Sequence, residues 1–403
     1  MTDSNLTNYS RRTLLATLGT GFLTGCLRTG ADTAPTQTTS TAAQSETATA
    51  TDVATATKTP EPPVSLSREW NAFFEPTGAP FVDGKTIYSG SRKGVRAIVA
   101  DDGTERWRTE QELISLRGTL DNDALYYTSF LEPGLYRANA GTGAVEATAD
   151  VGPAGGRPVV TSDYVVVGTD HNSGGDTTNE IVGLSKRDFS RIWSVSETDT
   201  SYGGGIAFDG RAIVGFGTPN QSRIEARNPA TGVVEWAVDG YLTAPLQQYD
   251  GSLYAPVASA GVDLLKIAPA DGTVVWRHTL EQLNDSMYVY TAAPTFDGDR
   301  AYFASYSQVH AIDLATGETV WKTTTDRPIK ATPAIVGDYV WVVPTALPDE
   351  ERNRELYGFD IETGEKVIQT RFAASTHNAL SLGDTLAVVM ENQVAAFSPE
   401  ANT

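Results

Sequence analysis

One pattern returns along most of this chain, about every 43 residues from Gly78 onward. Its clearest copy runs from Ala293 to Trp321, with an Asp297-Gly298 turn near its start and Thr316-Gly317 before its last strand. Turn dipeptides between short apolar stretches predict four antiparallel strands per unit. A chain of 403 residues exceeds the size that a single core fills, so we expect several domains or a closed array of units.

The first turn of the unit, Asp-Gly or an equivalent, occurs eight times. These turns are Asp83-Gly84, Asn122-Asp123, Ser162-Asp163, Asp209-Gly210, Asp250-Gly251, Asp297-Gly298, Gly337-Asp338 and Gly383-Asp384. A period of about 40–50 residues with four strands per unit is typical of a β-propeller. We therefore predict an all-β fold, an eight-bladed β-propeller of four-stranded blades, over residues 66–400.

The last unit lacks a fourth strand, because the chain stops at Thr403 soon after the strand that contains Phe397. Arg68-Glu69-Trp70 has the form of a fourth strand and precedes any first strand. We expect it to pair with the strands between Leu380 and Phe397. That pairing would close the ring and remove the exposed edges of an open array.

The N-terminus has the features of an export signal. Arg11 and Arg12 precede an apolar run, Leu14 to Leu23, that is too short for the roughly 20 residues of a membrane-spanning helix. The run ends at Leu23-Thr24-Gly25-Cys26, which resembles a lipobox. Residues 1–26 are thus predicted to be a twin-arginine signal, with lipid attached to Cys26. An incidental or buried cysteine is the alternative.

Residues 27–65 are rich in Thr, Ala, Ser and Pro and contain few large apolar side chains. Such a segment cannot bury enough surface to offset its ordering entropy, so we expect a disordered linker. As a flexible coil it would reach roughly 30–35 Å. Together with the signal, it predicts a protein exported by the twin-arginine route and lipid-anchored at the outer face of the cytoplasmic membrane.

The charge balance disfavours nucleic acid as a partner, because 50 acidic and 30 basic side chains give a net charge of −20. The carboxylate-rich, lysine-poor composition resembles that of haloarchaeal proteins. A halophilic protein should gain stability with salt, since the Debye length falls from about 30 Å at 0.01 M to about 3 Å at 1 M. An acidic binding face for a basic partner is the alternative.

The order Asp297-Gly298, Ala311-Ile312-Asp313, Thr316-Gly317 and Trp321 resembles the PQQ-like (quinoprotein-like) propeller repeat, over roughly Leu66 to Glu400. This family includes quinoprotein alcohol dehydrogenases and lipoproteins similar to the outer-membrane assembly factor BamB. The resemblance therefore implies a fold and leaves the function open. It also implies that the tryptophans dock neighbouring blades: Trp70, Trp107, Trp193, Trp236, Trp276 and Trp321.

Catalytic residues are not evident. Quinoprotein dehydrogenases commonly hold their cofactor against a disulfide of adjacent cysteines, with a calcium ion and a catalytic Asp nearby, whereas this chain has one cysteine. None of its four histidines lies near a nucleophile elbow or in a His-x-x-x-His pair. We expect no catalytic residue, metal or cofactor. The alternative is a PQQ-dependent or related oxidoreductase that uses the central funnel.

The segment before each first strand should lie at one mouth of the central channel. Three cations and three other polar side chains occupy such positions: Arg117, Arg157 and Lys330, with Tyr202, Tyr290 and His377. The cations either pair with carboxylates of turns or bind an anionic ligand or an acidic peptide. We therefore predict a monomeric propeller domain that acts as a scaffold for a protein or anionic ligand.

Overall fold

The computed structural model describes residues 64–111, 116–131, 134–169, 178–198, 201–218, 221–258, 261–280, 291–346 and 353–401. The predicted signal, including Arg11, Arg12 and Cys26, and the predicted linker up to residue 63 lie outside these ranges, as do His171 and Tyr290. The last two residues of the predicted linker, Val64 and Ser65, belong to the first strand of the propeller. Within these ranges, no helix is long and apolar enough to cross a membrane.

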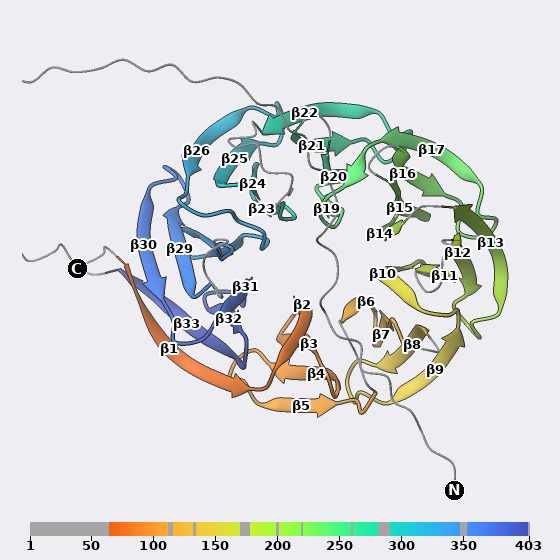
Figure 1. Ribbon diagram of the computed structural model, residues 1–403, viewed down its shortest axis with the longest axis horizontal. Coiled ribbons are helices and arrows are strands. Elements are labelled where there is room, and N and C mark those ends of the chain that lie inside the picture. Colours follow the sequence, from red (N-terminus) through yellow and green to blue (C-terminus); the bar gives the residue numbers. More distant parts are fainter. Residues whose placement is uncertain are drawn as a thin grey trace, which may run out of the picture. The chain divides into compact units, whose positions relative to one another are not determined.

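Eight antiparallel sheets surround a central axis, with each blade's first strand at the centre and its fourth strand at the rim (Figure 1). Blades 1 to 3 are β2 (Pro76–Asp83), β3 (Thr86–Ser91), β4 (Gly94–Val99) and β5 (Glu105–Arg108); β6 (Arg117–Asp121), β7 (Ala124–Thr128), β8 (Gly134–Asn139) and β9 (Val145–Asp150); and β10 (Ala154–Val160), β11 (Tyr164–Thr169), β12 (Thr178–Ser185) and β13 (Arg191–Thr198). Blades 4 and 5 are β14 (Ser201–Phe208), β15 (Arg211–Thr218), β16 (Gln221–Arg227) and β17 (Val234–Asp239); and β18 (Tyr241–Leu242), β19 (Gln247–Tyr249), β20 (Ser252–Ala258), β21 (Val262–Ile267) and β22 (Val274–Leu280). Blades 6 to 8 are β23 (Thr295–Asp297), β24 (Arg300–Ser305), β25 (Gln308–Asp313) and β26 (Thr319–Thr324); β27 (Ala334–Val336), β28 (Tyr339–Val342), β29 (Glu355–Asp360) and β30 (Lys366–Arg371); and β31 (Thr376–Ser381), β32 (Leu386–Met390), β33 (Gln393–Ala401) and β1 (Val64–Phe73). The predicted all-β, eight-bladed propeller is confirmed.

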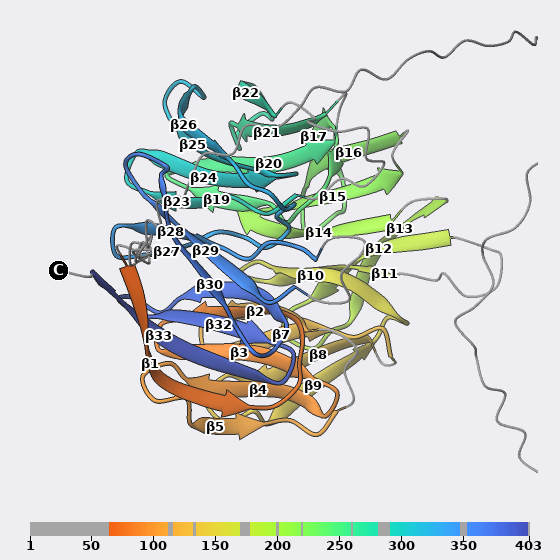
Figure 2. The same ribbon diagram turned by 60° about the vertical axis from the view of Figure 1, so that its left-hand side comes forward.

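The ring is closed by the two ends of the described chain. Strand β1 pairs antiparallel with β33, from Val64 opposite Ala401 to Phe73 opposite Gln393. Figure 2 shows the two strands side by side, coloured at opposite ends of the sequence scale. The predicted pairing of Arg68-Glu69-Trp70 with the last strands is therefore confirmed, in a ladder longer than that tripeptide.

The eight turn dipeptides each connect the first and second strands of a blade, as predicted. At Asp209-Gly210 both residues have positive φ, 49° and 74°, and Asp250-Gly251 repeats this with 42° and 70°. Positive φ at both central residues is the requirement of a type I′ turn, whose twist matches that of the flanking strands. The local sequence therefore selects the hairpin.

The tryptophans of the fourth strands contact the following blade. Each indole Nε1 donates to a backbone carbonyl there, at 2.8–3.0 Å. The pairs are Trp70 to Ala100, Trp107 to Ala140, Trp193 to Pro229, Trp236 to Pro269, Trp276 to Leu314 and Trp321 to Ile361. In one of these contacts the ring of Trp107 lies on Gly143, where an added Cβ would lie 2.4 Å from the ring. The joint between blades thus combines a hydrogen bond with a close aromatic contact.

The loop that receives each indole is shaped by a polar side chain at its start. Asp313 Oδ1 accepts from the backbone N–H groups of Ala315 and Thr316, at 3.0 and 2.8 Å, and from the Thr316 hydroxyl at 2.9 Å. These hydrogen bonds, with that of the Thr316 N–H largest, lower the pKa of Asp313. Asn139 and Asp360 make the same set of bonds in blades 2 and 7. These Asp and Asn side chains therefore stabilise their own turns.

Blade 5 departs from the expected single first strand. Two short strands, β18 and β19, both pair with β20. The segment Thr243–Leu246 separates them and contains Pro245, which has no N–H to donate to the ladder. The interruption leaves this segment at the centre of the ring.

Candidate functional site

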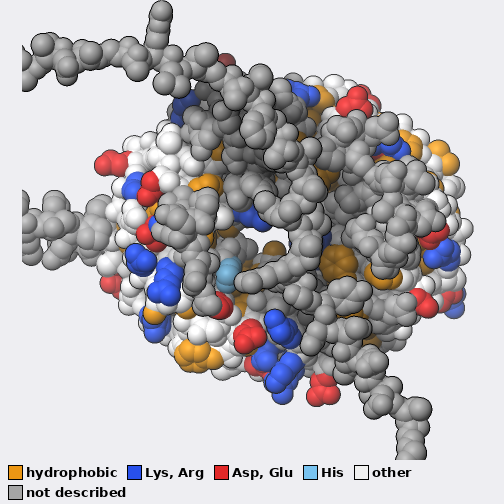
Figure 3. All heavy atoms as spheres, in the orientation of Figure 1, with side chains coloured by type: hydrophobic (Ala, Val, Ile, Leu, Met, Phe, Trp, Pro, Cys, Tyr) orange, Lys and Arg blue, Asp and Glu red, His pale blue; other side chains and the backbone are white. Residues whose placement is uncertain are grey.

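A cavity of about 930 Å³ occupies the centre of the propeller and is lined from all eight blades. Its walls take residues from on or just before each first strand, one example per blade being Gly78, Leu116, Arg157, Gly204, Leu242, Thr291, Lys330 and Ser375. Figure 3 looks into this opening and shows Lys or Arg side chains at its edge. Residues far apart in sequence therefore meet around one space.

The cavity wall carries positive charge. Arg117 at the start of β6, Arg157 in β10 and Lys330 before β27 all line it, and His377 of β31 lines it too. No Asp or Glu is among the described residues that line it. In a chain of net charge −20, this cavity has the opposite sign from the protein as a whole.

The two predicted tyrosines do not join the cations. Tyr290 lies outside the described residues. Tyr202 is not part of the cavity wall; its ring packs against Gly156 and Gly168 of blade 3, where an added Cβ would lie 2.6 and 2.0 Å from it. Its hydroxyl donates to the Arg157 carbonyl at 3.4 Å. Tyr202 therefore supports the backbone behind Arg157, and we leave it out of the candidate site.

One alternative for the cations was that they pair with carboxylates of turns. Two of them, Arg157 and Lys330, have no such partner among the described residues. Within the part of the chain that the structure describes, the side chains of Arg157 and Lys330 make no ion pair or hydrogen bond. The Arg157 guanidinium carbon lies 5.8 Å from the centre of the Phe81 ring. Desolvation lowers the pKa of Arg157, although the group stays protonated. An uncompensated charge in such surroundings attracts an anion more strongly than one in bulk water.

Two buried hydroxyls add further hydrogen-bonding capacity to the wall. Thr291 and Ser375 are 6% and 5% exposed, and neither hydroxyl has a hydrogen-bond partner among the described residues. Both residues line the cavity. A buried hydroxyl without a partner costs about 1–3 kcal/mol, which a ligand or water in the cavity would recover. Sequence reasoning missed these two; their only signal was a position just before the first strands of blades 6 and 8.

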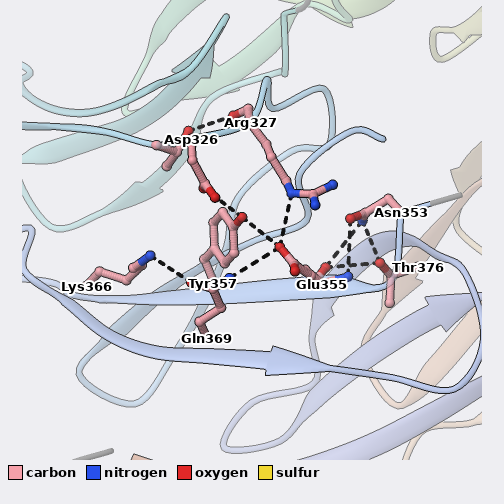
Figure 4. A network of polar contacts seen from close by, with 9 residues as sticks. Asp326, Arg327, Asn353, Glu355, Tyr357, Lys366, Gln369 and Thr376 are labelled. Carbon is pink, nitrogen blue, oxygen red and sulfur yellow. Dashed lines mark hydrogen bonds and ion pairs between the residues drawn. The ribbon is translucent and has the colours of Figure 1, made fainter. Parts of the chain in front are cut away.

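A buried carboxylate supports the wall at blades 7 and 8 (Figure 4). Glu355 is 9% exposed, and its Oε2 atom lies 3.2 Å from Arg327 Nε in an ion pair. The same oxygen accepts from Tyr357 Oη at 2.9 Å and from Gln369 Nε2 at 3.3 Å. The ion pair with Arg327 and the hydrogen bonds from Tyr357 and Gln369 compensate this carboxylate, as a buried charge requires. Burial and the neighbouring carboxylates raise the pKa of Tyr357.

This cluster is tied directly to two residues of the cavity wall. Asn353 Nδ2 donates to Thr376 Oγ1 at 2.7 Å, and Thr376 Oγ1 donates to the Glu355 carbonyl at 3.0 Å. The Glu355 N–H in turn donates to Asn353 Oδ1 at 3.2 Å. Asn353 and Thr376 both line the cavity, so the network holds its polar wall in place. The sequence contained no local motif for it, because its members come from four separate segments.

The cavity wall fits only part of a quinoprotein site. Its cations suit the carboxylates of PQQ. A calcium ion in such a site needs carboxylate oxygens, and no carboxylate lines the described wall, although His377 there could serve as a base. Among the described residues, no cluster of three or more His, Cys, Asp or Glu side chains could hold a metal ion. The donor set therefore suits an anion and does not fit the calcium-PQQ pair.

Two histidines lie outside the cavity, at the joint between blades 5 and 6. His278 and His310 are 9% and 4% exposed. Nδ1 of His278 lies 2.8 Å from the Gly317 carbonyl oxygen, and its Nε2 lies 3.3 Å from Nδ1 of His310. His310 Nε2 lies 3.1 Å from the Gln308 side-chain oxygen. The pair therefore bridges two blades through buried polar contacts.

We predict that this pair makes stability depend on pH. Burial lowers the pKa of His278, although the hydrogen bond to the Gly317 carbonyl and the charge of Asp263 oppose that shift. Burial, with His278 and Lys322 nearby, lowers the pKa of His310 to about 3. Below about pH 6.5 the unfolded chain takes up protons that the folded chain does not, so stability is lost as the pH falls. Urea midpoints at pH 7.5 and 5.5 should differ less in His278→Gln/His310→Gln than in the wild type. An equal difference would contradict this.

Comparison with known proteins gives one family. The model described as outer membrane protein assembly factor BamB matches residues 91–240 and 261–401. No curated protein matches the chain. Each structural likeness below is to a chain under 25% identical, and so it shows the fold alone.

Three solved structures illustrate the likeness. BamB from Moraxella catarrhalis is 16% identical, with a TM-score of 0.62 over 83% of this chain and 98% of that one. Quinohemoprotein alcohol dehydrogenase from Comamonas testosteroni is 13% identical, with 0.60 over 83% and 76%. Sqt1 from Saccharomyces cerevisiae is 9% identical, with 0.60 over 83% and 99%. Since the family model covers well over half of the sequence, the chain belongs to the family of the outer membrane protein assembly factor BamB.

Proposed function

We propose that this protein is an exported, lipid-anchored binding module whose propeller holds an anionic ligand, or an anionic segment of a partner protein, in its central cavity. One observation carries the proposal. The cavity wall is cationic and has no described carboxylate, and Arg157 and Lys330 have no ion-pair partner among the described residues.

The energetics favour this reading over a purely structural role for the cations. A desolvated charge without an ion-pair partner lowers the stability of the fold, and Arg157 is such a charge. The ring does not require a cation in this part of a blade, since the residues that line the cavity from other blades of this chain include Gly78, Gly204 and Leu242. A positive cavity within an acidic protein selects anions and repels cationic ligands.

The proposed location of the protein is based on its N-terminal sequence. Lipid on Cys26 would hold the chain at the outer face of the cytoplasmic membrane, and the linker over residues 27–65 would let the propeller reach roughly 30–35 Å from it. A saline exterior suits the acidic composition, because salt screens carboxylate repulsion. The module would then meet anionic partners outside the cell.

Binding is the direct test of the cavity. PQQ and a panel of acidic peptides are titrated against the wild type and Arg117→Ala/Arg157→Ala/Lys330→Ala. We expect the triple variant to bind at least about tenfold more weakly, a loss of about 1.4 kcal/mol. The control is Arg92→Ala/Lys93→Ala/Arg187→Ala, which removes three exposed cations outside the cavity wall. Equal binding by the wild type and the cavity variant would refute the proposal, and PQQ binding alone would not establish a dehydrogenase.

Anchoring has a separate test. Cys26→Ser should release the mature protein from membranes, and Arg11→Lys with Arg12→Lys should block export of the folded precursor. The measurements are membrane fractionation and mass spectrometry of the mature N-terminus. A wild-type mature protein that is unlipidated, with residues 1–25 still attached, would contradict the anchor without bearing on the cavity.

A further inference from the structure

The two unpaired cations of the cavity lie on opposite sides of the ring. Arg157 belongs to blade 3, and Lys330 precedes the first strand of blade 7. Three of the eight blades therefore lie between them in either direction around the ring. Figure 1 shows β10 of blade 3 across the central axis from β29 of blade 7. Both side chains line the cavity, so they face its interior from opposite walls.

The cavity is too wide for one small anion to bridge these groups. A sphere with the volume of the cavity, about 930 Å³, is about 12 Å across, whereas a hydrogen bond joins heavy atoms about 3 Å apart. A single carboxylate or phosphate would contact one wall and leave the opposite charge unpaired. Pairing both charges at once requires two anionic groups.

Each cation has hydrogen-bond donors in the blades beside it. Lys330 in blade 7 lies between blade 6, which contributes the unpaired hydroxyl of Thr291, and blade 8, which contributes that of Ser375. Arg157 in blade 3 lies beside Arg117 of blade 2 and the backbone of Gly203–Gly205 in blade 4, where no side chain blocks access. The wall thus contains two separate donor sets.

The wall between these two sets has no Asp, Glu, Lys or Arg among the described residues: it is polar at blade 8, where Thr376, His377 and Asn378 line it, and mainly apolar at blades 5 and 1. On one side the interrupted strand of blade 5 contributes Leu242, Ala244, Pro245 and Leu246 to the lining. On the other side, Phe81 of blade 1 lines it as well. A charged group in the middle of a ligand would lose water there without gaining a partner. The middle of the ligand is therefore uncharged.

We infer that the cavity binds a two-headed ligand, with one anionic group at Lys330, a second at Arg157, and an uncharged spacer between them. This inference rests on the proposed function and specifies its ligand class. Small dicarboxylates and a protein segment with two acidic side chains share this chemistry. In an extended segment, which rises about 3.3 Å per residue, about three or four residues would span the cavity.

Two linked contacts give a dependence on spacer length that single anions lack. Once one group is bound, the second binds within the same molecule at a high effective concentration. A spacer that is too short reaches only one cation, and a longer one than needed loses affinity with its added flexibility. Affinity should therefore pass through a maximum as the spacer grows.

The test is calorimetric titration of the full-length protein with linear α,ω-dicarboxylates of four to about fourteen carbon atoms, each paired with its monocarboxylate. In the wild type, an intermediate length should bind at least about tenfold more tightly than its monocarboxylate. Lys330→Met and Arg157→Met should each abolish that maximum. Lys93→Met, which removes an exposed cation outside the cavity wall, should retain it.

A charge reversal keeps the test independent of whether a variant folds less well. Lys330→Glu should lose affinity for the best diacid and gain affinity for the ω-amino carboxylate of the same length, because one wall then attracts a cation. Peptides with two acidic residues separated by zero to six leucine or serine residues distinguish the sources: a maximum for peptides alone supports a protein segment, and a maximum for diacids alone supports a small molecule.

Different results of these titrations would overturn this inference and the proposed function. Diacids that bind no better than monocarboxylates at every length, with equal losses in the variants, would overturn the two-headed ligand and leave anion binding intact. Absence of binding by every diacid, monocarboxylate and peptide would overturn both.

Discussion

Removing strand β1 should abolish cooperative unfolding of the propeller. A chain that begins at Gly78 lacks the fourth strand of blade 8 and the first two residues of β2, so β33 loses its ladder with β1 and exposes an open edge. It also loses Val64 and Trp70, which are 1% and 9% exposed and pack in two different core clusters. Calorimetry should show a broad or absent transition, and light scattering should show aggregation.

Two controls distinguish the loss of ring closure from the loss of the residues that precede β1. A chain that begins at Thr59 retains β1 and should melt like the full-length protein. Within β1, Trp70→Ala should cost about 3–5 kcal/mol. Phe73→Ala should cost no more than about 0.5 kcal/mol, because Phe73 is 74% exposed. A chain from Gly78 that melts at the wild-type temperature in a single transition would refute the closure.

Replacing Gly143 with alanine should destabilise the joint between blades 1 and 2. Gly143 has φ +73°, and a Cβ there would lie 2.4 Å from Cε3 of Trp107. The backbone conformation costs an alanine about 1–2 kcal/mol. Displacing the buried indole adds about 1–3 kcal/mol of overpacking, so the expected total is about 2–5 kcal/mol. Urea unfolding followed by tryptophan fluorescence measures it.

The chain offers a matched control for this substitution. Gly210 has φ +74°, almost the same as Gly143, but an added Cβ there meets no atom within 4 Å. Gly210→Ala should therefore cost only the backbone share, about 1–2 kcal/mol. The difference between the two variants isolates the contact with Trp107. Equal losses would show that the indole moves aside at little cost.

The fold was largely predictable because its determinants are local. Asp-Gly at a hairpin requires positive φ, and the Asp-x-x-Thr-Gly loop satisfies its own N–H groups, so both can be seen in sequence without a neighbour. Counting these signals predicts eight blades. The interrupted first strand of blade 5 was not predicted, since its two halves align only against β20.

The candidate site was predictable only where topology decides position. Arg117, Arg157, Lys330 and His377 line the cavity because each lies within a first strand, or just before one. Tyr202 has a similar position in sequence, yet its ring packs against glycines of blade 3. That contact depends on the space that the glycines of the adjacent blade leave for the ring. The spacing of residues along one blade does not show this space.

The carboxylate cluster behind the wall illustrates the same limit. Glu355 meets Arg327 and Gln369 from other segments, so no short motif encodes it. Thr291 and Ser375 look like ordinary strand-entry residues in the sequence. Their role depends on burial and on unpaired hydroxyls, which are properties of the assembled ring.

The seam between β1 and β33 also sets an order of events during synthesis. Val64 leaves the ribosome early, and its partner Ala401 leaves it after every other blade has been made. Through that interval β1 has no partner, so the blades assemble as an open arc. Closure through such distant residues is slow relative to local hairpin formation. A ribosome that stops before β33 therefore releases an arc with two free edges, and only a chain that has been read to its last strand becomes a ring.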